Sequence, residues 1–350
     1  MKILITGTAG FIGFHLANRL ALEGHDIIGI DSINNYYDVT LKSNRLAEAG
    51  FDAGLIAYNS KVQSSKFSNY AFIQLQLEDA ASLQLLFTIE KFEVVINLAA
   101  QAGVRYSLTH PAAYINSNVV GFANLLECCR HFVIKHLIYA SSSSVYGLNE
   151  QVPFATNHST NHPASLYAAT KKSNELMAHV YSHLFNIPVT GLRFFTVYGP
   201  WGRPDMAPFL FTDAIMHDKP IKVFNNGDMM RDFTYIDDVV EGMVRVIEAV
   251  PKPNPNWDAE NPEASTSSAP YKLYNIGNSK PVALIDFISC IEKVTGKIAI
   301  KEMLPIQPGD VQATFADTTE LEEDLSYKPA TTLHTGIENF VAWYKNYYKH

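Results

Sequence analysis

The feature that most constrains this chain is a glycine-rich turn within its first fifteen residues. Gly7, Gly10 and Gly13 form the pattern G-x-x-G-x-x-G. The apolar run Lys2–Ile5 before it is typical of a buried strand, and residues 10–23 after it have helical periodicity. Glycines at these positions allow a tight turn, a close approach of the backbone to a ligand, and close packing of helix against strand. The chain is therefore expected to begin with a strand–turn–helix unit that can hold a phosphate group at the helix N-terminus.

Short apolar runs alternate with helical patterns through the first two hundred residues. After the first strand, further strands are expected at Asp26–Asp31, Ala71–Leu75, Val94–Leu98, His136–Ser141 and Val189–Arg193. Continuous apolar strands separated by helices indicate a parallel sheet that is covered on both faces. The sequence therefore predicts a doubly wound parallel sheet, a Rossmann-like α/β fold.

A segment rich in Pro, Asn and Ser at 251–270 separates this pattern from a smaller C-terminal part. Beyond this extended loop, a strand at Lys272–Ile276, a helix from Leu284 and a closing helix at Gly336–Tyr348 predict a smaller α/β unit. The polar, aperiodic residues 49–68 are expected to form a surface insertion. The expected domains are a dinucleotide-binding domain over 1–200, to which 225–250 returns, and a substrate domain over 201–224 and 251–350.

The composition narrows the class of protein further. With a formal net charge of −8 and scattered basic residues, the chain lacks the basic stripe of a nucleic-acid binder. No apolar run reaches the ~18 residues of a membrane span and no signal peptide is evident, so no membrane association is expected.

Cys128, Cys129 and Cys290 give neither a disulfide framework nor a CxxC zinc spacing, which suits a reducing cytoplasm. His179 and His183 lie one helical turn apart without a third ligand, so no metal is expected.

An acidic residue closes the second expected strand. Asp31 lies 24 positions after Gly7 and is placed to accept hydrogen bonds from the 2′-hydroxyl of a ribose. Its negative charge would repel a 2′-phosphate. The glycine turn and Asp31 together predict that the chain binds NAD rather than NADP.

A tyrosine and a lysine stand one helical turn apart. Tyr167 and Lys171 form a Y-x-x-x-K pair on one predicted helix face. A phenol titrates near pH ~10, which is too high for an effective base at neutral pH. A cation one turn away, helped by the positive nicotinamide of NAD⁺, favours the phenolate and lowers that pKa. Upstream, the expected strand His136–Ser141 runs into a series of hydroxyls, Ser141–Ser144, at the edge of the sheet where such folds bind ligands.

Together these motifs resemble the extended short-chain dehydrogenase/reductase family of nucleotide-sugar enzymes. The resemblance covers the whole chain and includes Val145-Tyr146-Gly147 after the serines, Asn97–Ala100, Asn118 and Arg231–Asp238. It implies that Ser142 is the catalytic hydroxyl and Tyr167 the acid/base, and that Lys171 holds the nicotinamide ribose and tunes the tyrosine. It also implies that the smaller domain binds a nucleotide sugar.

The resemblance also implies which residues hold NAD. They are Gly7, Gly10, Phe11, Ile12, Gly13, Asp31, Gln76, Leu98, Ala99, Ala100, Gln101, Asn118, Tyr167 and Lys171. Two positions depart from the family. Gln76 replaces the usual aspartate beside the adenine, and Ser32 stands where asparagine is common after the ribose-binding acid.

The serine run distinguishes between reactions within the family. Members that eliminate water or CO2 carry a carboxylate just before the Val-Tyr-Gly tripeptide. Here that position is Ser144, and Ser143 stands where dehydratases place an aspartate. Without a carboxylate, abstraction of a proton at C5 has no evident base. The resemblance therefore implies reversible hydride transfer at C4, as in a 4-epimerase.

Longer segments resemble the UDP-glucuronate 4-epimerases of this family: Gln101–Ser107, Gly191–Met206, Asn254–Ala269 and Gln307–Val311. A C6 carboxylate needs a cation or several donors, and a guanidinium group suits it, so Arg105 and Arg203 are candidates for that contact. The expected substrate-binding residues are Arg105, Ser142, Ser143, Ser144, Thr196, Arg203, Phe224, Arg231 on the diphosphate and Asp310 on the uridine ribose.

Two alternatives remain open on sequence alone. One is another UDP-sugar 4-epimerase of the same family, acting on UDP-glucose and UDP-galactose. The other is a non-catalytic NAD sensor, although such proteins tend to lose the tyrosine–lysine pair that this chain retains. By analogy with similar folds, helices spanning 118–131 and 167–184 are expected to pair in a homodimer.

Overall fold

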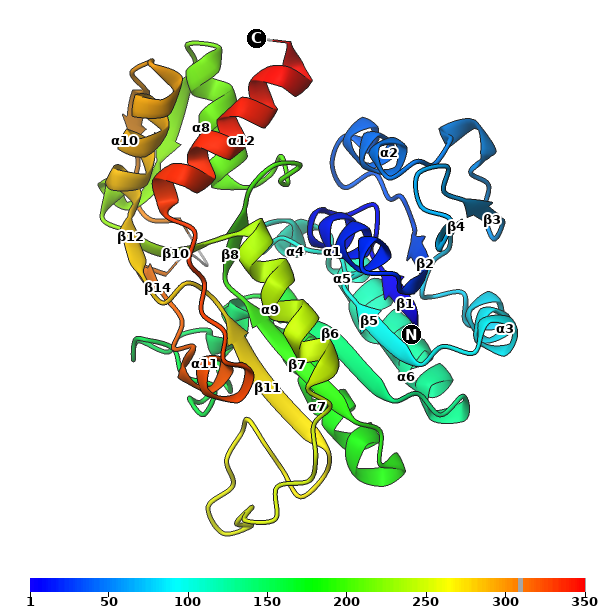
Figure 1. Cartoon of the computed structure of the whole chain (residues 1–350). Coiled ribbons are helices and arrows are strands. Elements are labelled where there is room, and N and C mark those ends of the chain that lie inside the picture. Colours follow the sequence, from blue (N-terminus) through cyan, green and yellow to red (C-terminus); the bar gives the residue numbers. More distant parts are fainter. Residues whose placement is uncertain (308–310, 350) are drawn as a thin grey trace. The chain divides into compact units, whose positions relative to one another are not determined.

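The computed structural model describes residues 1–307 and 311–349. These residues divide into two compact units (Figure 1). Unit 1 comprises 1–149, 156–193 and 243–274, and unit 2 comprises 150–155, 194–242 and 275–350. These bounds differ from the expected domains, because residues 225–242 lie in unit 2 and residues 251–274 lie in unit 1.

An eight-stranded sheet forms the centre of unit 1, in the order β11-β7-β6-β5-β1-β2-β4-β3. Its strands are β1 (Lys2–Thr6), β2 (Asp26–Asp31), β3 (Lys61–Gln63), β4 (Tyr70–Gln74), β5 (Val94–Asn97), β6 (His136–Ser142), β7 (Val189–Phe194) and β11 (Tyr271–Ile276). The ladders from β6 through β5, β1 and β2 to β4 are parallel, whereas the edge strand β3 is antiparallel to β4. The predicted Rossmann-like fold is confirmed.

Helices cover both faces of this sheet (Figure 1). The α-helices that precede β7 along the chain are α1 (Phe11–Leu22), α2 (Val39–Glu48), α3 (Ala80–Glu90), α4 (Tyr106–Thr109), α5 (Pro111–Tyr114), α6 (Gly121–His131) and α7 (Leu166–Phe185). A π-helical turn, Ile115–Val120, joins α5 to α6. Apolar residues of α3, α6 and α7, including Phe87, Leu125 and Ala178, form one core with the strands. This packing fixes the strand ends at which the candidate site is built.

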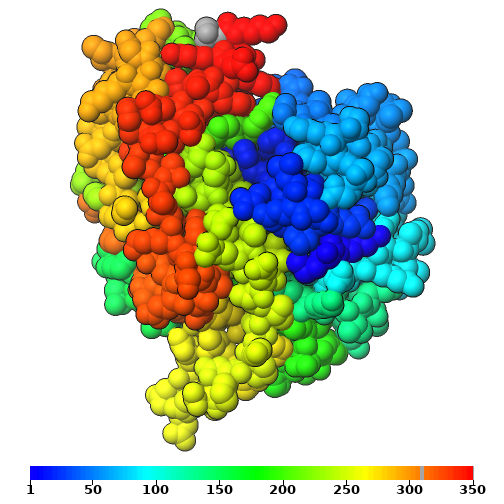
Figure 2. Space-filling view, viewed as in Figure 1, coloured from blue at the N-terminus to red at the C-terminus, as the bar shows by residue number. Residues whose placement is uncertain are grey.

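The strand expected at 272–276 was assigned to the wrong unit. It is β11, which lies beside β7 at the edge of the large sheet. The space comes from Gly191 of β7, because a Cβ there would lie only 2.5 Å from Leu273 and 2.4 Å from the hydroxyl of Tyr139. The loop 251–270 therefore lies within unit 1, and Figure 2 shows it in yellow at the lower edge of the surface.

Residues 49–68, expected as a surface insertion, contribute to the same sheet. They contain β3 and a short 3-10 helix, Ala53–Leu55. The segment is held by its own polar contacts: the hydroxyl of Ser64 donates to the carbonyl of Ala49 at 2.7 Å. The edge strand therefore gives this segment a structural role in protecting β4.

Unit 2 is a smaller α/β assembly. Its strands β8 (Thr196–Tyr198), β10 (Met230–Tyr235), β12 (Pro281–Ala283) and β14 (Ala313–Thr314) form one mixed sheet, and β9 (Pro220–Val223) pairs with β13 (Ile300–Met303). Its helices are α8 (Ala207–Met216), α10 (Leu284–Thr295), α11 (Thr319–Leu325) and α12 (Leu333–Tyr348), and α9 (Ile236–Glu248) begins in it.

A buried carboxylate organises unit 2. Asp232 of β10 is fully buried and accepts hydrogen bonds from the backbone N–H groups of Asn278, Ser279 and Ala316 at 2.7–3.0 Å. Burial raises the pKa of Asp232, while these three donors act against that rise.

In the part of the chain that the structure describes, no helix is long and apolar enough to cross a bilayer.

Candidate active site

The glycine turn has the geometry that a phosphate-binding loop requires. Gly7 has a φ of +79°, and a Cβ on it would lie 2.8 Å from the backbone nitrogen of Ala99. A Cβ on Gly13 would lie 2.2 Å from the carbonyl oxygen of Gly7, so any side chain there would separate α1 from the turn. Gly10 caps α1 without a side-chain hydrogen bond, which leaves the first N–H groups of the helix, at Phe11 and Ile12, for a ligand. These features fit a dinucleotide diphosphate.

Asp31 braces the turn from the end of β2. Its carboxylate accepts hydrogen bonds from the N–H of Ala9 at 3.1 Å and from that of Ile33 at 2.8 Å. A carboxylate has about four acceptor positions, so capacity remains for ribose hydroxyls. Arg45 of α2 holds the turn from the other side, because its fully buried guanidinium donates to the carbonyl of Ala9 at 3.0 Å. Sequence reasoning missed Arg45, since an arginine in an amphipathic helix carries no local sign of burial.

The loop after β5 is fixed by Asn118 of the π-helical turn. Its side-chain oxygen accepts from the N–H of Gln101 at 2.8 Å, and its amide donates to the carbonyl of Gln101 and to the hydroxyl of Thr170 of α7. Asn118 thus joins the loop Leu98–Gln101, which contains Ala99 and Ala100, to the helix that carries Tyr167. Gln76 is exposed in the turn after β4.

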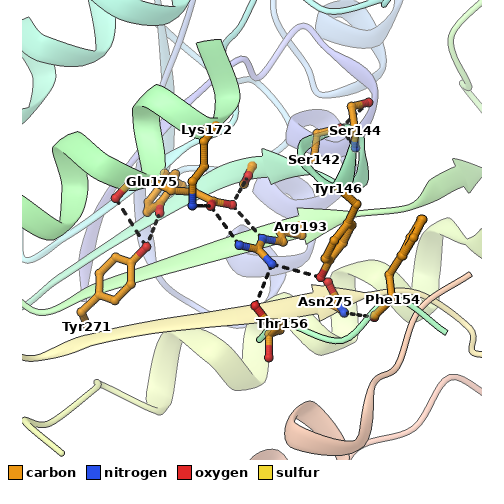
Figure 3. Close-up of polar contacts among 12 residues, drawn as sticks. Ser142, Ser144, Tyr146, Phe154, Thr156, Lys172, Glu175, Arg193, Tyr271 and Asn275 are labelled. Atoms are coloured by element: carbon orange, nitrogen blue, oxygen red, sulfur yellow. Dashed lines mark hydrogen bonds and ion pairs between the residues drawn. The ribbon is translucent and has the colours of Figure 1, made fainter. Parts of the chain in front are cut away.

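The serine run begins where β6 ends. Ser142, which is 8% exposed, accepts a hydrogen bond from the N–H of Ser144 at 3.2 Å and donates one to its hydroxyl at 3.1 Å (Figure 3). Ser143 and Ser144 are half-buried in the short 3-10 helix Ser143–Tyr146. Ser141 is buried, and its hydroxyl donates to Glu175 of α7. The run therefore combines one hydroxyl tied to the interior with a hydrogen-bonded pair at the strand end.

Tyr167 lies in the first turn of α7, which Ser165 caps by accepting from the N–H of Ala168. The ring of Tyr167 is half-buried and meets that of Tyr114 edge-on at a centroid distance of 6.0 Å. Tyr167 thus lies at the N-terminal end of α7, one turn before Lys171.

Lys171 follows one turn later and is 2% exposed. Its ammonium donates to the carbonyl of Ala140 at 2.8 Å, and the described residues offer it no other partner. Burial lowers the pKa of Lys171 from 10.5 to about 8. A buried ammonium with unfilled hydrogen-bonding capacity fits a group that holds ribose hydroxyls.

The expected substrate residues are distributed over both units. Arg105 is exposed at the start of α4 in unit 1. In unit 2, Thr196 begins β8 and Phe224 begins a short turn after β9. Asp310 lies outside the described residues. Contacts of these residues with a sugar nucleotide remain predictions.

Two arginines of unit 2 have specific partners. Arg203 forms a two-pronged ion pair with Asp205, with Nε 3.0 Å from Oδ1. Arg231 of β10 donates to the carbonyls of Met230, Val311 and Gln312 at 2.7–3.0 Å. Arg231 is thus bound to backbone carbonyls of its own strand β10 and of the two residues just before β14. Its contact with a diphosphate stays a prediction.

The histidine pair lies one turn apart on α7, as predicted. The rings of His179 and His183 are parallel, with centroids 6.3 Å apart. Among residues 1–307 and 311–349, no group of three or more His, Cys, Asp or Glu side chains could hold a metal ion.

Known proteins resemble the chain over its full length. A probable UDP-glucuronate 4-epimerase of Rhizobium meliloti is 48% identical over 351 residues, covering 100% of this chain and 98% of that protein. A solved UDP-glucuronic acid 4-epimerase from Bacillus cereus, in complex with UDP-glucuronic acid and NAD, is 33% identical with a TM-score of 0.82, over 99% of this chain and 100% of that one. A UDP-glucose 4-epimerase from Thermotoga maritima is 26% identical with a TM-score of 0.81, over 99% of this chain and 100% of that one.

The model of one protein family matches residues 3–258. This range contains the glycine turn, Asp31, the serine run, Tyr167 and Lys171, whereas Gln307–Val311 lies beyond it. The chain belongs to the NAD-dependent epimerase/dehydratase family.

Proposed function

We propose that this chain interconverts UDP-glucuronate and UDP-galacturonate by NAD-dependent epimerisation at C4. The observation that carries the proposal is the placement of Tyr167 and Lys171 on one face of α7, next to a strand end that presents Ser142 and no carboxylate at 143 or 144. This set of groups can move a proton at a sugar hydroxyl but has no base for C5. The relatives named UDP-glucuronate 4-epimerase, which span the whole chain, support the same reaction.

In the proposed mechanism, bound NAD supplies an acceptor and donor for the hydrogen at C4. Tyr167, in its phenolate form, takes the proton from O4, while Ser142 donates a hydrogen bond to O4. Lys171 stabilises the phenolate and holds the nicotinamide ribose. The 4-keto sugar, still tethered by its UDP, then turns over, so that the hydrogen is returned to the opposite face of C4 and Tyr167 returns its proton to O4. No net oxidation occurs, so NAD is expected to stay bound through many turnovers.

A second candidate is the epimerisation of UDP-glucose. The pairing of Arg203 with Asp205 favours it, because the carboxylate of Asp205 offsets the positive charge that Arg203 would offer to a C6 carboxylate. If the substrate is UDP-glucuronate instead, Arg105 is the remaining candidate for the cation that binds its C6 carboxylate. A non-catalytic NAD sensor is less consistent with the retained tyrosine, lysine and serine.

One incubation separates these readings. The purified chain is mixed with UDP-glucuronate or with UDP-glucose, each with and without added NAD, and the products are resolved by chromatography. We expect UDP-galacturonate from UDP-glucuronate without added NAD. UDP-galactose from UDP-glucose alone would favour the second candidate, and no product from either sugar would contradict both. UDP-pentose and CO2 as main products would contradict simple epimerisation.

We assign NAD binding to unit 1 and nucleotide-sugar binding to unit 2, and we place the protein in the reducing cytoplasm.

We also propose that the chain is a homodimer through α6 and α7. On α7, Leu176, Val180 and Leu184 follow one another at i, i+4 and i+8 and are 48–62% exposed. Ile115 and Val120, just before α6, are 42–44% exposed. A second copy of the chain, bringing the same face, would bury this apolar row.

Replacement of Val180 by glutamate is expected to convert the dimer to a monomer, because it places a charge at the centre of the apolar row. Sedimentation velocity measures the change. Ile89→Glu is the matched control, since Ile89 of α3 is 65% exposed and lies away from the row in sequence and on another helix. A dimer that survives Val180→Glu would count against this interface.

A further inference from the structure

A buried ion pair joins β7 to the helix of Tyr167 and Lys171. Arg193 of β7 and Glu175 of α7 are 0% and 1% exposed. The guanidinium meets the carboxylate at two points, with Nε 2.8 Å from Oε1 and Nη2 3.0 Å from Oε2 (Figure 3). Burial raises the pKa of Glu175, but Arg193 and Lys172 outweigh this effect and leave the pKa below its ordinary value. The pair is therefore ionised at neutral pH.

The pair holds Ser141, at the start of the serine run, and Tyr146, two residues past its end. At one end, the hydroxyl of Ser141 donates to Oε1 of Glu175 at 2.7 Å. At the other end, Nη1 of Arg193 donates to the hydroxyl of Tyr146 at 3.1 Å, and the guanidinium lies 4.9 Å from the centre of the Tyr146 ring. Residues 142–144 lie between these two attachments. The segment that carries Ser142 is thus flanked by two side chains that the ion pair holds, one of which, Tyr146, is labelled in Figure 3.

The same pair fixes the distance from the serines to the helix. Glu175 lies four residues after Lys171 and eight after Tyr167, so all three share one face of α7. Lys171 donates to the carbonyl of Ala140, and Glu175 accepts from the hydroxyl of the next residue, Ser141. Two consecutive residues of β6 are therefore bonded to two consecutive turns of α7.

A buried ion pair is a costly way to stabilise a fold, since well-packed apolar residues often do as well or better. Unlike apolar groups, a charged pair makes directional hydrogen bonds at several fixed points. The contacts named above end on α7, which carries Tyr167, or on Ser141 and Tyr146, which flank residues 142–144; Nη1 of Arg193 also donates to the carbonyl of Thr156 at 3.0 Å, outside both segments. We propose that Glu175 and Arg193 are positioning residues, which set the spacing between the hydroxyl of Ser142 and the phenol of Tyr167. The proposal rests on the epimerase function above.

The test removes one contact without breaking the ion pair. Ser141→Ala deletes the hydrogen bond to Glu175 and leaves Arg193 in place. We expect kcat for UDP-glucuronate to fall about ten- to a hundredfold, because small misplacements of reacting groups have effects of this size. The KM, the amount of bound NAD and the melting temperature should change little, the last by a few degrees at most. Glu175→Gln, which keeps the shape but removes the charge, should lower kcat further.

Ser182→Ala is the matched control. Ser182 lies on the same helix and is fully buried, and its hydroxyl has no hydrogen-bond partner among the described residues. It should leave kcat unchanged. A Ser141→Ala enzyme with the kcat of Ser182→Ala, or one in which only KM or stability changes, would overturn the positioning role while the wild-type reaction stands. An inactive wild-type chain would instead overturn the function on which the role depends.

Discussion

Replacement of Tyr167 by phenylalanine is expected to lower kcat for 4-epimerisation by about a thousandfold or more. The phenol is the only group in the proposed mechanism that takes and returns the O4 proton, and general acid–base catalysis contributes about 10²- to 10⁴-fold. Phenylalanine keeps the edge-on contact with Tyr114, so the helix should remain in place. The KM for the sugar nucleotide and the bound NAD should stay near wild type, which steady-state kinetics and nucleotide absorbance measure.

Tyr181→Phe provides the control for this substitution. Tyr181 lies on the same helix, but its hydroxyl donates to Glu127 of α6. Loss of this hydroxyl should leave kcat within about twofold, because its hydrogen bond joins α7 to α6 and involves none of the groups in the proposed mechanism. If the Tyr167→Phe enzyme kept a tenth of the wild-type kcat, another group would have to move the O4 proton and the mechanism would be wrong.

The local motifs were predictable because their chemistry depends on short-range spacing. A strand, a glycine turn and a helix in sequence can form one phosphate cradle, and the structure confirms that Gly7 and Gly13 have no room for a Cβ. The Y-x-x-x-K spacing likewise determines that Tyr167 and Lys171 share a helix face. Such features need only a few consecutive residues to be arranged correctly.

Features that depend on distant pairings were not predictable in the same way. The strand β11 has the same apolar character as a strand of either unit, and its place beside β7 depends on a gap opened by Gly191. Similarly, nothing near Arg193 in the sequence shows that it is fully buried, because its partner Glu175 is 18 residues away on another element. Arg45 was missed for the same reason. Long-range packing decides these positions, and a single sequence does not display it.

Replacement of Lys171 by methionine is expected to lower kcat by about 10²- to 10³-fold while leaving the fold at least as stable at pH 7. The loss in kcat follows from removal of the cation that favours the phenolate of Tyr167. The effect on stability has the opposite sign. Because burial lowers the pKa of Lys171 from 10.5 to about 8, the folded state binds its proton less tightly than the unfolded state does. Folding therefore carries a penalty of about 3 kcal/mol below pH 8, which disappears as the pH rises to 10.5.

The pH dependence distinguishes this account from simple damage to the site. In the wild type, kcat should fall above pH 8 as Lys171 loses its proton, while the free energy of unfolding should rise relative to that of Lys171→Met between pH 8 and 10.5. In Lys171→Met, part of the gain in the free energy of unfolding is offset at every pH, because the carbonyl of Ala140 loses its hydrogen-bond donor. Lys135→Met, at an exposed ion pair with Glu93, should alter neither profile. If the wild type and Lys171→Met differed in stability by the same amount at pH 7 and pH 10.5, Lys171 would not be a buried cation held for catalysis at the expense of the fold.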